Sequence, residues 1–330
     1  MSDLAAIPVI DVGALVGAGG DRSAVARAIG RACRDAGFFY AIGHGIDPAL
    51  QARLEALAKQ FFAAPDAVKR TIAMERGGRA WRGWFPVGAE LTSGRPDWKE
   101  GLYFGAEQGD SHPRVRDGTP LHGANLFPAI DGFRETVLAW IDAMTRLGHA
   151  LMGGIALSLD LPEDWFAARY LRDPVVLFRI FNYPEIPASD DEPLWSVGEH
   201  TDYGVLTILL QDDAGGLQVK VGDGWIGAPP IPGSFVCNLG DMLDRMTGGL
   251  YRSTPHRVRN AAKRDRLSFP FFFDPSWDAR VQPIPGCPVL REDASERWDQ
   301  ASVHAFDGTY GDYLLAKVSK VFPGLRQAVL

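Results

Sequence analysis

Residues 198–219 read GEHTDYGVLTILLQDDAGGLQV, and their pattern is typical of a β-hairpin. Two apolar runs with strand-like spacing flank the turn sequence DDAGG. His200 and Asp202 stand two apart where the first run begins. Because alternate residues of an extended strand point to the same face, we expect an imidazole and a carboxylate side by side, with Thr201 turned away.

The second half of the chain continues in short apolar runs separated by Gly, Pro and Asp. Regular short strands of this kind favour a β-sandwich or a barrel. Along the last run, alternation predicts that Phe271 and Phe273 face the core, opposite Arg266. The strand candidates are PVVLFRIFNYP (174–184), GVLTILLQ (204–211), GLQVKV (216–221), GSFVCNLG (233–240), PHRVRN (255–260) and RLSFPFFFD (266–274).

The first half of the chain has mainly helical patterns. Asp47 followed by Pro48 is typical of a helix start and predicts a helix over residues 47–62. A longer helix is expected over residues 129–159, and the tail 309–325 is again helical. We therefore predict a mainly β fold with flanking helices, of the α+β class.

The composition is that of an ordinary globular protein with an acidic balance. Its 34 basic and 41 acidic residues give a formal net charge of −7, which argues against nucleic-acid binding driven by phosphate contacts. No apolar stretch approaches the roughly 20 residues that a membrane span needs. The N-terminus lacks a signal-peptide pattern, and three widely spaced cysteines form no disulfide framework. We expect a cytoplasmic protein with no membrane association and no obligate protein partner.

A third candidate ligand lies in STPHRV, where His256 begins another predicted strand. Two imidazoles and one carboxylate on one face of a metal leave the opposite positions open, which suits non-haem Fe(II) and O₂ chemistry. We therefore predict that His200, Asp202 and His256 bind Fe(II) and form the catalytic centre. The alternative is that His200 and Asp202 form a local hydrogen-bonded turn and His256 is an unrelated surface residue.

Arg266 and Ser268 come shortly after His256 and are again two apart on a predicted strand. A guanidinium and a hydroxyl on one strand face are a natural clamp for a carboxylate. The alternative is a surface arginine paired with Asp265 or a glutamate.

These motifs together resemble a known family. The order His-Thr-Asp (200–202), His256 and Arg-Leu-Ser (266–268) is similar to that of the Fe(II)- and 2-oxoglutarate-dependent dioxygenases of the isopenicillin N synthase-like group. The resemblance extends through HTDYGVLTILLQDDAGGLQV and GDMLDRMTGGLYRSTPHRV to the N-terminal IPVIDV and ACRDAGFFYAIGHGI. It covers about residues 5–320.

The resemblance implies a double-stranded β-helix, or jelly-roll, core that holds iron at its open end. Residues 131–330 would form this catalytic core with a long support helix and a C-terminal helix. Residues 1–130 would form the N-terminal helical and strand region of the dioxygenase fold, and the two parts would make one structural unit.

The resemblance also implies the cofactors. 2-Oxoglutarate would chelate the iron through its 2-oxo acid end and meet Arg266 and Ser268 with its far carboxylate. Its decarboxylation to succinate and CO₂, with O₂, would support attack on a C–H bond of a small molecule, and ascorbate is the expected activator in vitro. Tyr183 matches a tyrosine that hydrogen-bonds the co-substrate carboxylate in several relatives, and its neighbour Asn182 is expected to touch the same ligand. Arg179 matches a position where some relatives have a basic residue near the co-substrate or the substrate. For Arg179, a salt bridge across the barrel rim is an equally open alternative.

The substrate region is expected in RAWRGWFPVGAEL (79–91) and DWKEGLYFG (97–105), which resemble segments that face the substrate in this group. The alternative is that their aromatic residues are core under a long loop. The candidate substrate residues are Arg79, Trp81, Arg82, Trp84, Phe85, Tyr103 and Phe104.

Three functions fit the sequence. The first is a 2-oxoglutarate-dependent oxygenase that hydroxylates, desaturates or cyclises a small molecule. The second is an iron oxidase of the same fold that takes no external 2-oxo acid, as in isopenicillin N synthase, or an ethylene-forming relative. The third is a non-catalytic jelly-roll binding module, against which the intact set of metal and anion candidates weighs. The sequence names neither the substrate nor the oligomeric state.

Overall fold

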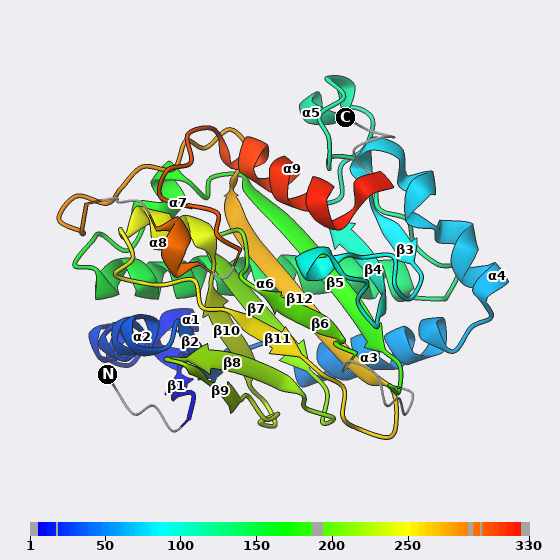
Figure 1. Ribbon diagram of the computed structural model, residues 1–330, viewed down its shortest axis with the longest axis horizontal. Coiled ribbons are helices and arrows are strands. Elements are labelled where there is room, and N and C mark those ends of the chain that lie inside the picture. The colour runs from blue at the N-terminus through cyan, green and yellow to red at the C-terminus, as the bar shows by residue number, and fades with distance from the viewer. Residues whose placement is uncertain (1–5, 18, 187–193, 290–292, 298, 325–330) are drawn as a thin grey trace.

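Two β-sheets form the centre of the molecule (Figure 1). The structure is a computed structural model that describes residues 6–17, 19–186, 194–289, 293–297 and 299–324. The larger sheet has the strand order β1-β2-β10-β7-β12-β5-β4-β3, and the smaller has the order β6-β11-β8-β9. The strands are β1 (Val9–Asp11), β2 (Phe38–Ile42), β3 (Gly83–Phe85), β4 (Glu100–Gly105), β5 (Pro174–Tyr183), β6 (Val197–His200), β7 (Leu206–Gln211), β8 (Leu217–Val221), β9 (Gly224–Gly227), β10 (Phe235–Leu239), β11 (His256–Val258) and β12 (Arg266–Ser276).

The predicted hairpin at residues 198–219 is wrong. Strand β7 pairs with β10 and β12 in the larger sheet, whereas β8 pairs with β9 and β11 in the smaller one. The DDAGG turn therefore carries the chain from one sheet to the other. Turn residues predict that the chain reverses direction, but they do not specify which strand becomes the hydrogen-bonded neighbour.

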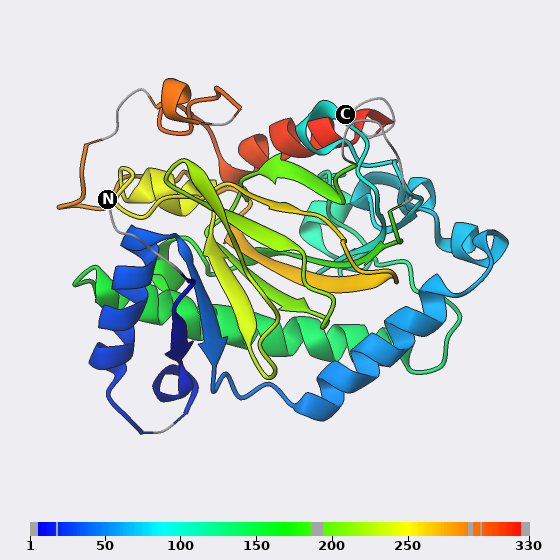
Figure 2. The ribbon, with the colours of Figure 1, turned by 60° about the horizontal axis from the view of Figure 1, so that its bottom comes forward.

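The long helix α6 (Phe133–Ser158) runs across one face of the larger sheet, as Figure 2 shows. It begins four residues later than predicted because Gly132, at its N-cap, has φ +72°, a left-handed conformation that ends the preceding loop. Its predicted apolar face is buried, with Phe133 and Val137 fully enclosed. The long helix and its apolar face are therefore confirmed.

Four of the other helices, α1, α2, α3 and α7, pack against α6. Asp47 caps α3 through the backbone N–H of Ala49 at 2.8 Å, as its position before Pro48 predicted. None of the described helices combines the length and apolar character needed to cross a bilayer. The helices are α1 (Gly13–Val16), α2 (Arg22–Asp35), α3 (Pro48–Phe62), α4 (Asp66–Lys69), α5 (Pro113–Arg116), α7 (Trp165–Arg169), α8 (Asp241–Met246) and α9 (Tyr310–Val321), with 3₁₀ turns at Arg70–Ile72, Met74–Ala80, Thr92–Gly94 and Ala294–Glu296.

Strand β12 lies between β7 and β5 and separates the core from an interior pocket. Phe271 and Phe273 are fully buried, as alternation predicted. Arg266 and Ser268 face the other way and line the pocket between the two sheets. The mainly β architecture with flanking helices is thus confirmed. One face of each sheet is directed at the pocket.

Candidate active site

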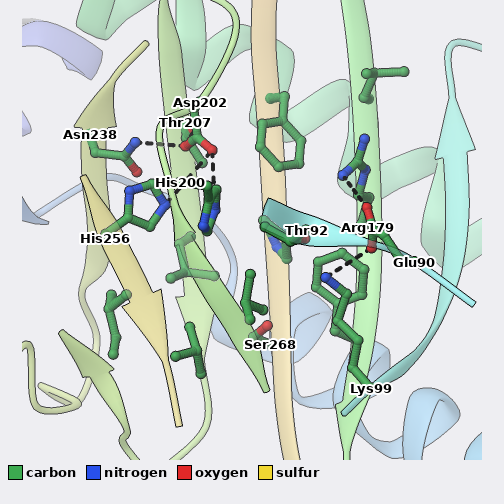
Figure 3. Close-up of a pocket in the computed structure, with 18 of the residues that line it drawn as sticks. Glu90, Thr92, Lys99, Arg179, His200, Asp202, Thr207, Asn238, His256 and Ser268 are labelled. Atoms are coloured by element: carbon green, nitrogen blue, oxygen red, sulfur yellow. Dashed lines mark hydrogen bonds and ion pairs between the residues drawn. The ribbon is translucent and has the colours of Figure 1, made fainter. Parts of the chain in front are cut away.

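His200 is the last residue of β6 and His256 is the first residue of β11. The two residues are cross-strand partners in the smaller sheet. Their ring centroids are 4.2 Å apart. Asp202 lies two residues beyond the end of β6, and its Oδ1 lies 3.9 Å from Nε2 of His200 and 3.8 Å from Nε2 of His256. The three ligand atoms lie within 4.8 Å of one another, and Figure 3 shows the side chains converging. The structure therefore brings the predicted triad together, and Thr201 lines a separate cavity as expected.

The backbone orients both imidazoles. Nδ1 of His200 lies 2.8 Å from the carbonyl oxygen of Gly198, and Nδ1 of His256 lies 3.2 Å from that of Thr254. A carbonyl oxygen can only accept, so each Nδ1 carries the proton. Each Nε2 is therefore left with its lone pair directed at the common point, as in metal-binding histidines.

Two side chains fix the carboxylate of Asp202. Its Oδ2 accepts a hydrogen bond from Oγ1 of Thr207 at 2.6 Å and another from Nδ2 of Asn238 at 2.7 Å (Figure 3). These bonds use one oxygen and leave Oδ1 facing the two imidazoles. Neither Thr207 nor Asn238 was predicted, although both stand on predicted strands. Such outer-shell donors orient a ligating carboxylate.

The protonation states suit a divalent cation. Burial, with the neighbouring His256, lowers the pKa of His200 to about 3. Burial alone would raise the pKa of Asp202, but His256, His200 and the two hydrogen bonds hold it below its usual value. At neutral pH the site thus offers a neutral His200 and an anionic carboxylate. This donor set fits Fe(II), and among the described residues no other group of three or more such side chains converges in this way.

The second end of the pocket is built around Arg266, which is fully buried. Its Nε donates to the carbonyl oxygen of Gly215, and its Nη2 lies 3.3 Å from Oε1 of Gln211. Its Nη1 is buried without a hydrogen-bond partner. The alternative of a surface arginine paired with Asp265 is therefore wrong, and the unmatched donor fits an anionic ligand.

Two hydroxyl groups stand beside this guanidinium. Oγ of Ser268 lies 3.0 Å from the hydroxyl oxygen of Tyr183, and the Tyr183 ring centroid lies 4.8 Å from the Arg266 guanidinium carbon. Arg266 and Tyr183 are cross-strand partners in β12 and β5. Arginine, serine and tyrosine thus form one cluster of donors, as a carboxylate clamp requires.

The prediction that Asn182 lies near the co-substrate needs correction. Asn182 follows the alternation of β5, so its side chain points to the opposite face from its neighbour Tyr183. Its Nδ2 lies 3.1 Å from Oε1 of Glu100 and 3.1 Å from Oδ2 of Asp265. It does not line the pocket, because its amide is taken up by these two carboxylates.

All seven predicted substrate residues lie outside the pocket. Trp84, Phe85 and Phe104 are buried in the core, and Nε1 of Trp84 donates to Glu100 at 2.9 Å. Their interpretation as pocket residues is therefore wrong, and the alternative of core under a loop is correct. Large aromatic side chains bury more surface against the core than they would at the pocket wall.

The remaining candidates have structural partners. Arg82 is buried and donates to backbone carbonyl oxygens that include that of Ala106, at 2.8 Å. Arg79 is exposed and donates to the carbonyl oxygen of Gly118. Trp81 and Tyr103 are buried and border a smaller cavity away from the triad. None of these four lines the pocket that the triad shares with Arg266.

Arg179 does line that pocket, and the residues around it were not predicted. Its Nη1 lies 3.7 Å from Oε1 of Glu90, and Nζ of Lys99 lies 2.8 Å from Oε2 of the same carboxylate. Thr92 stands beside them (Figure 3). The only signal in the sequence was charge at the start of the apolar strand EGLYFG, where Lys99 precedes Glu100. A buried charge there needs a partner.

Two family models match the chain. The model described as non-haem dioxygenase in morphine synthesis N-terminal matches residues 7–130, and the model of the 2OG-Fe(II) oxygenase superfamily matches residues 163–275. The second match contains His200, Asp202, His256 and the Arg266–Ser268 motif.

Curated relatives and solved structures agree with these matches. A probable iron/ascorbate oxidoreductase of Dictyostelium discoideum is 54% identical over 93% of this chain and 91% of its own length. The 1-aminocyclopropane-1-carboxylate oxidase of Dictyostelium mucoroides is 39% identical over 97% of this chain and 96% of its own. The crystal structure of a full-length Neurospora crassa protein in complex with α-KG, which is 2-oxoglutarate, has a TM-score of 0.78 at 27% identity and covers 97% of this chain and 98% of that one. With its two-sheet, double-stranded β-helix core and its His-Asp-His site, this chain belongs to the 2OG-Fe(II) oxygenase superfamily.

Proposed function

We propose that the protein uses Fe(II), O₂ and 2-oxoglutarate to hydroxylate a small molecule, with Nε2 of His200, Nε2 of His256 and Oδ1 of Asp202 holding the iron. The observation that carries this proposal is the convergence of these three atoms within 4.8 Å. Each of the three side chains is oriented by a hydrogen bond on its other polar atom. When bound, Fe(II) with 2-oxoglutarate supplies O₂ activation coupled to formation of succinate and CO₂.

Arg266, Ser268 and Tyr183 are proposed to hold the far carboxylate of 2-oxoglutarate. Nη1 of Arg266 is buried without a partner, and the two hydroxyl groups stand next to it. Burial of an unpaired donor is costly, so an anion at this position would stabilise the guanidinium. Apolar side chains that include Leu217 and Val258 line the same pocket and would exclude water from the pair.

The remaining volume of the pocket is proposed to take a small molecule. The name of the 39% identical relative includes a small carboxylic acid, and that of the 54% identical relative includes ascorbate, in keeping with ascorbate as activator. We also infer membership of the isopenicillin N synthase-like group, for which the order of the sequence motifs is the support. A cytoplasmic location remains part of the proposal, and it rests on the sequence features given above.

Succinate formation from labelled 2-oxoglutarate, with Fe(II), ascorbate and O₂, tests the proposal. We expect slow turnover without a primary substrate, because the iron and co-substrate groups are complete in the chain alone. An iron oxidase that takes no external 2-oxo acid would consume O₂ with a substrate but form no succinate. A binding module would do neither, and either outcome would contradict the proposed function.

A further inference from the structure

Three buried charged side chains and the partly buried Arg179 form an alternating chain beside the pocket. Glu90, Lys99 and Arg179 line the pocket, and Asp97 lies behind them. Nζ of Lys99 lies 2.8 Å from Oδ2 of Asp97 and 2.8 Å from Oε2 of Glu90, and Oε1 of Glu90 lies 3.7 Å from Nη1 of Arg179. Anion, cation, anion and cation follow one another in this order. Burying such charges carries a large desolvation penalty in general, and apolar residues in their place are often as stable. Stability alone therefore does not account for them.

The inner members of the chain have their charges satisfied. Lys99 lies between two carboxylates at hydrogen-bond distance. Oε2 of Glu90 is ion-paired with Lys99, and Oε1 accepts a hydrogen bond from the hydroxyl of Tyr103 at 2.5 Å. Burial alone would raise the pKa of Glu90, but Lys99 and Arg179 hold it below its usual value. The negative charge of Glu90 is therefore matched by two cations.

Arg179 is the end of the chain, and its charge is only partly matched. Its contact with Glu90, at 3.7 Å, is longer than a hydrogen bond, and its Nε is buried without a partner. The ring centroid of Tyr103 lies 4.0 Å from its guanidinium carbon and that of Phe272 lies 4.8 Å away. These rings hold the side chain in place while its N–H groups remain available for a ligand. The unpaired polar group of Arg179 is thus a positively charged hydrogen-bond donor.

The position of Arg179 suits recognition of a substrate. It projects from β5 into the pocket that also holds His200 and Asp202, and Figure 3 shows it on the other side of that pocket from the triad. The co-substrate cluster of Arg266 is a separate group of donors farther along β12 and β5. A molecule anchored at Arg179 would therefore face the metal without displacing 2-oxoglutarate from Arg266.

We propose that Arg179 anchors a carboxylate of the primary substrate, so that the enzyme acts on small carboxylic acids. The inference rests on the proposed function and extends it to a substrate class. A planar guanidinium matches a carboxylate through paired N–H donors, and charged hydrogen bonds are about twice as strong as neutral ones. A substrate carboxylate would continue the alternation of charge beyond Arg179. Glu90 acts as a positioning residue, since its carboxylate contacts both Lys99 and Arg179.

The test uses the Mn(II)-loaded protein, which binds ligands without turnover. Saturating 2-oxoglutarate is titrated in first by calorimetry and occupies the Arg266 end. Small aliphatic, aromatic and amino-acid monocarboxylates are then titrated, each beside its own primary carboxamide, which has the same shape without the charge. We expect some of the acids to bind saturably. The matching amides should bind roughly tenfold or more weakly.

Three variants make the assignment specific. Arg179→Gln should weaken binding of the tightest-binding acid roughly 30-fold or more. It should also abolish the preference for the acid over its amide. Arg179→Lys keeps the charge and should retain part of the preference, because a point charge replaces the planar fork. Arg146→Gln is the matched control: its side chain is 68% exposed on α6, and both ligand classes should bind as in the wild type.

The outcomes separate the two proposals. Failure of the wild type to bind 2-oxoglutarate with Mn(II) would overturn the proposed function. Normal binding of 2-oxoglutarate would support that function, and the binding of the acids would then test Arg179 alone. In that case, amides binding as well as acids, an undiminished acid preference in Arg179→Gln, or no acid binding at all would each overturn the assignment of Arg179.

Discussion

The carboxylate of Asp274 occupies the space that a side chain on Gly204 would need. A Cβ atom on Gly204 would lie 1.4 Å from Oδ1 of Asp274 and 2.2 Å from its Cγ. Asp274 cannot easily retreat, because it is buried and its Oδ2 accepts from the hydroxyl of Tyr310, on α9, at 2.5 Å. Gly204 follows Asp202 in the loop between β6 and β7. The contact thus packs β12 and α9 against the loop that carries a proposed iron ligand.

We expect Gly204→Ala to lower the free energy of unfolding and weaken Fe(II) binding, because the methyl group must displace either Asp274 or the loop. Overpacking of this kind costs about 1–3 kcal/mol. Gly227→Ala is the matched control, since no atom lies within 4 Å of a Cβ built there. Thermal unfolding and anaerobic Fe(II) titration of both variants check the prediction. Equal behaviour of the two variants would contradict it.

Asp274 should also make stability depend on pH. Burial raises its pKa from the usual 3.8 to about 7. The folded protein therefore keeps a proton on Asp274 that the unfolded chain loses above about pH 4. The resulting stabilisation is largest at acid pH and is lost as the pH rises through 7. We expect Asp274→Asn, which cannot titrate, to show a flatter dependence of melting temperature on pH between 5 and 8. Parallel curves for the two proteins would argue against the prediction.

Arg266→Ala should weaken binding of 2-oxoglutarate to the Mn(II)-loaded protein. Removing one partner of a desolvated charged pair costs roughly 2–5 kcal/mol, which corresponds to about 30-fold to several thousand-fold in affinity. Ser268→Ala should cost less, about 1–2 kcal/mol, because it removes a neutral donor. Calorimetry gives both values. An unchanged dissociation constant in Arg266→Ala would mean that the co-substrate carboxylate binds elsewhere.

Lys99→Met should destabilise the fold strongly. It would leave the buried carboxylates of Glu90 and Asp97 without their common partner, and breaking a buried pair in this way costs about 3–5 kcal/mol. Lys220→Met is the control, because its pair with Glu199 is partly exposed and worth at most about 1 kcal/mol. Urea unfolding of both variants measures the difference. Similar losses would show that the buried chain of charges contributes no more than a surface pair.

Local patterns predicted the elements and their faces well. The Asp47 cap set the start of α3, and alternation along β12 separated the core residues Phe271 and Phe273 from the pocket residues Arg266 and Ser268. These features depend on residues close in sequence, whose geometry is fixed by the repeat of the strand or helix.

The features that were mispredicted depend on long-range neighbours. The contact between Lys99 and Glu90 was not predicted, because the two residues lie nine apart with a loop between them and are brought together only by the folded chain. The expectation that Asn182 touches the co-substrate was wrong because adjacent strand residues point to opposite faces, and Asn182 therefore faces away from Tyr183. The sequence predicts Trp84 in the pocket, whereas its indole N–H donates a hydrogen bond to Glu100 in the core. Residue type alone does not distinguish a buried aromatic from a ligand contact.

Asp202 is the only anionic ligand of the proposed iron site. Anaerobic titration of the apo protein with Fe(II) measures iron binding directly. The metal-to-ligand charge-transfer absorption that appears when 2-oxoglutarate is added reports the same site. We predict one Fe(II) per wild-type chain, a loss of that binding in Asp202→Ala, and a weakening of about 10–100-fold in Asn238→Ala, which removes only a donor that orients the carboxylate. Full iron binding and unchanged absorption in Asp202→Ala would contradict the assignment of the metal site.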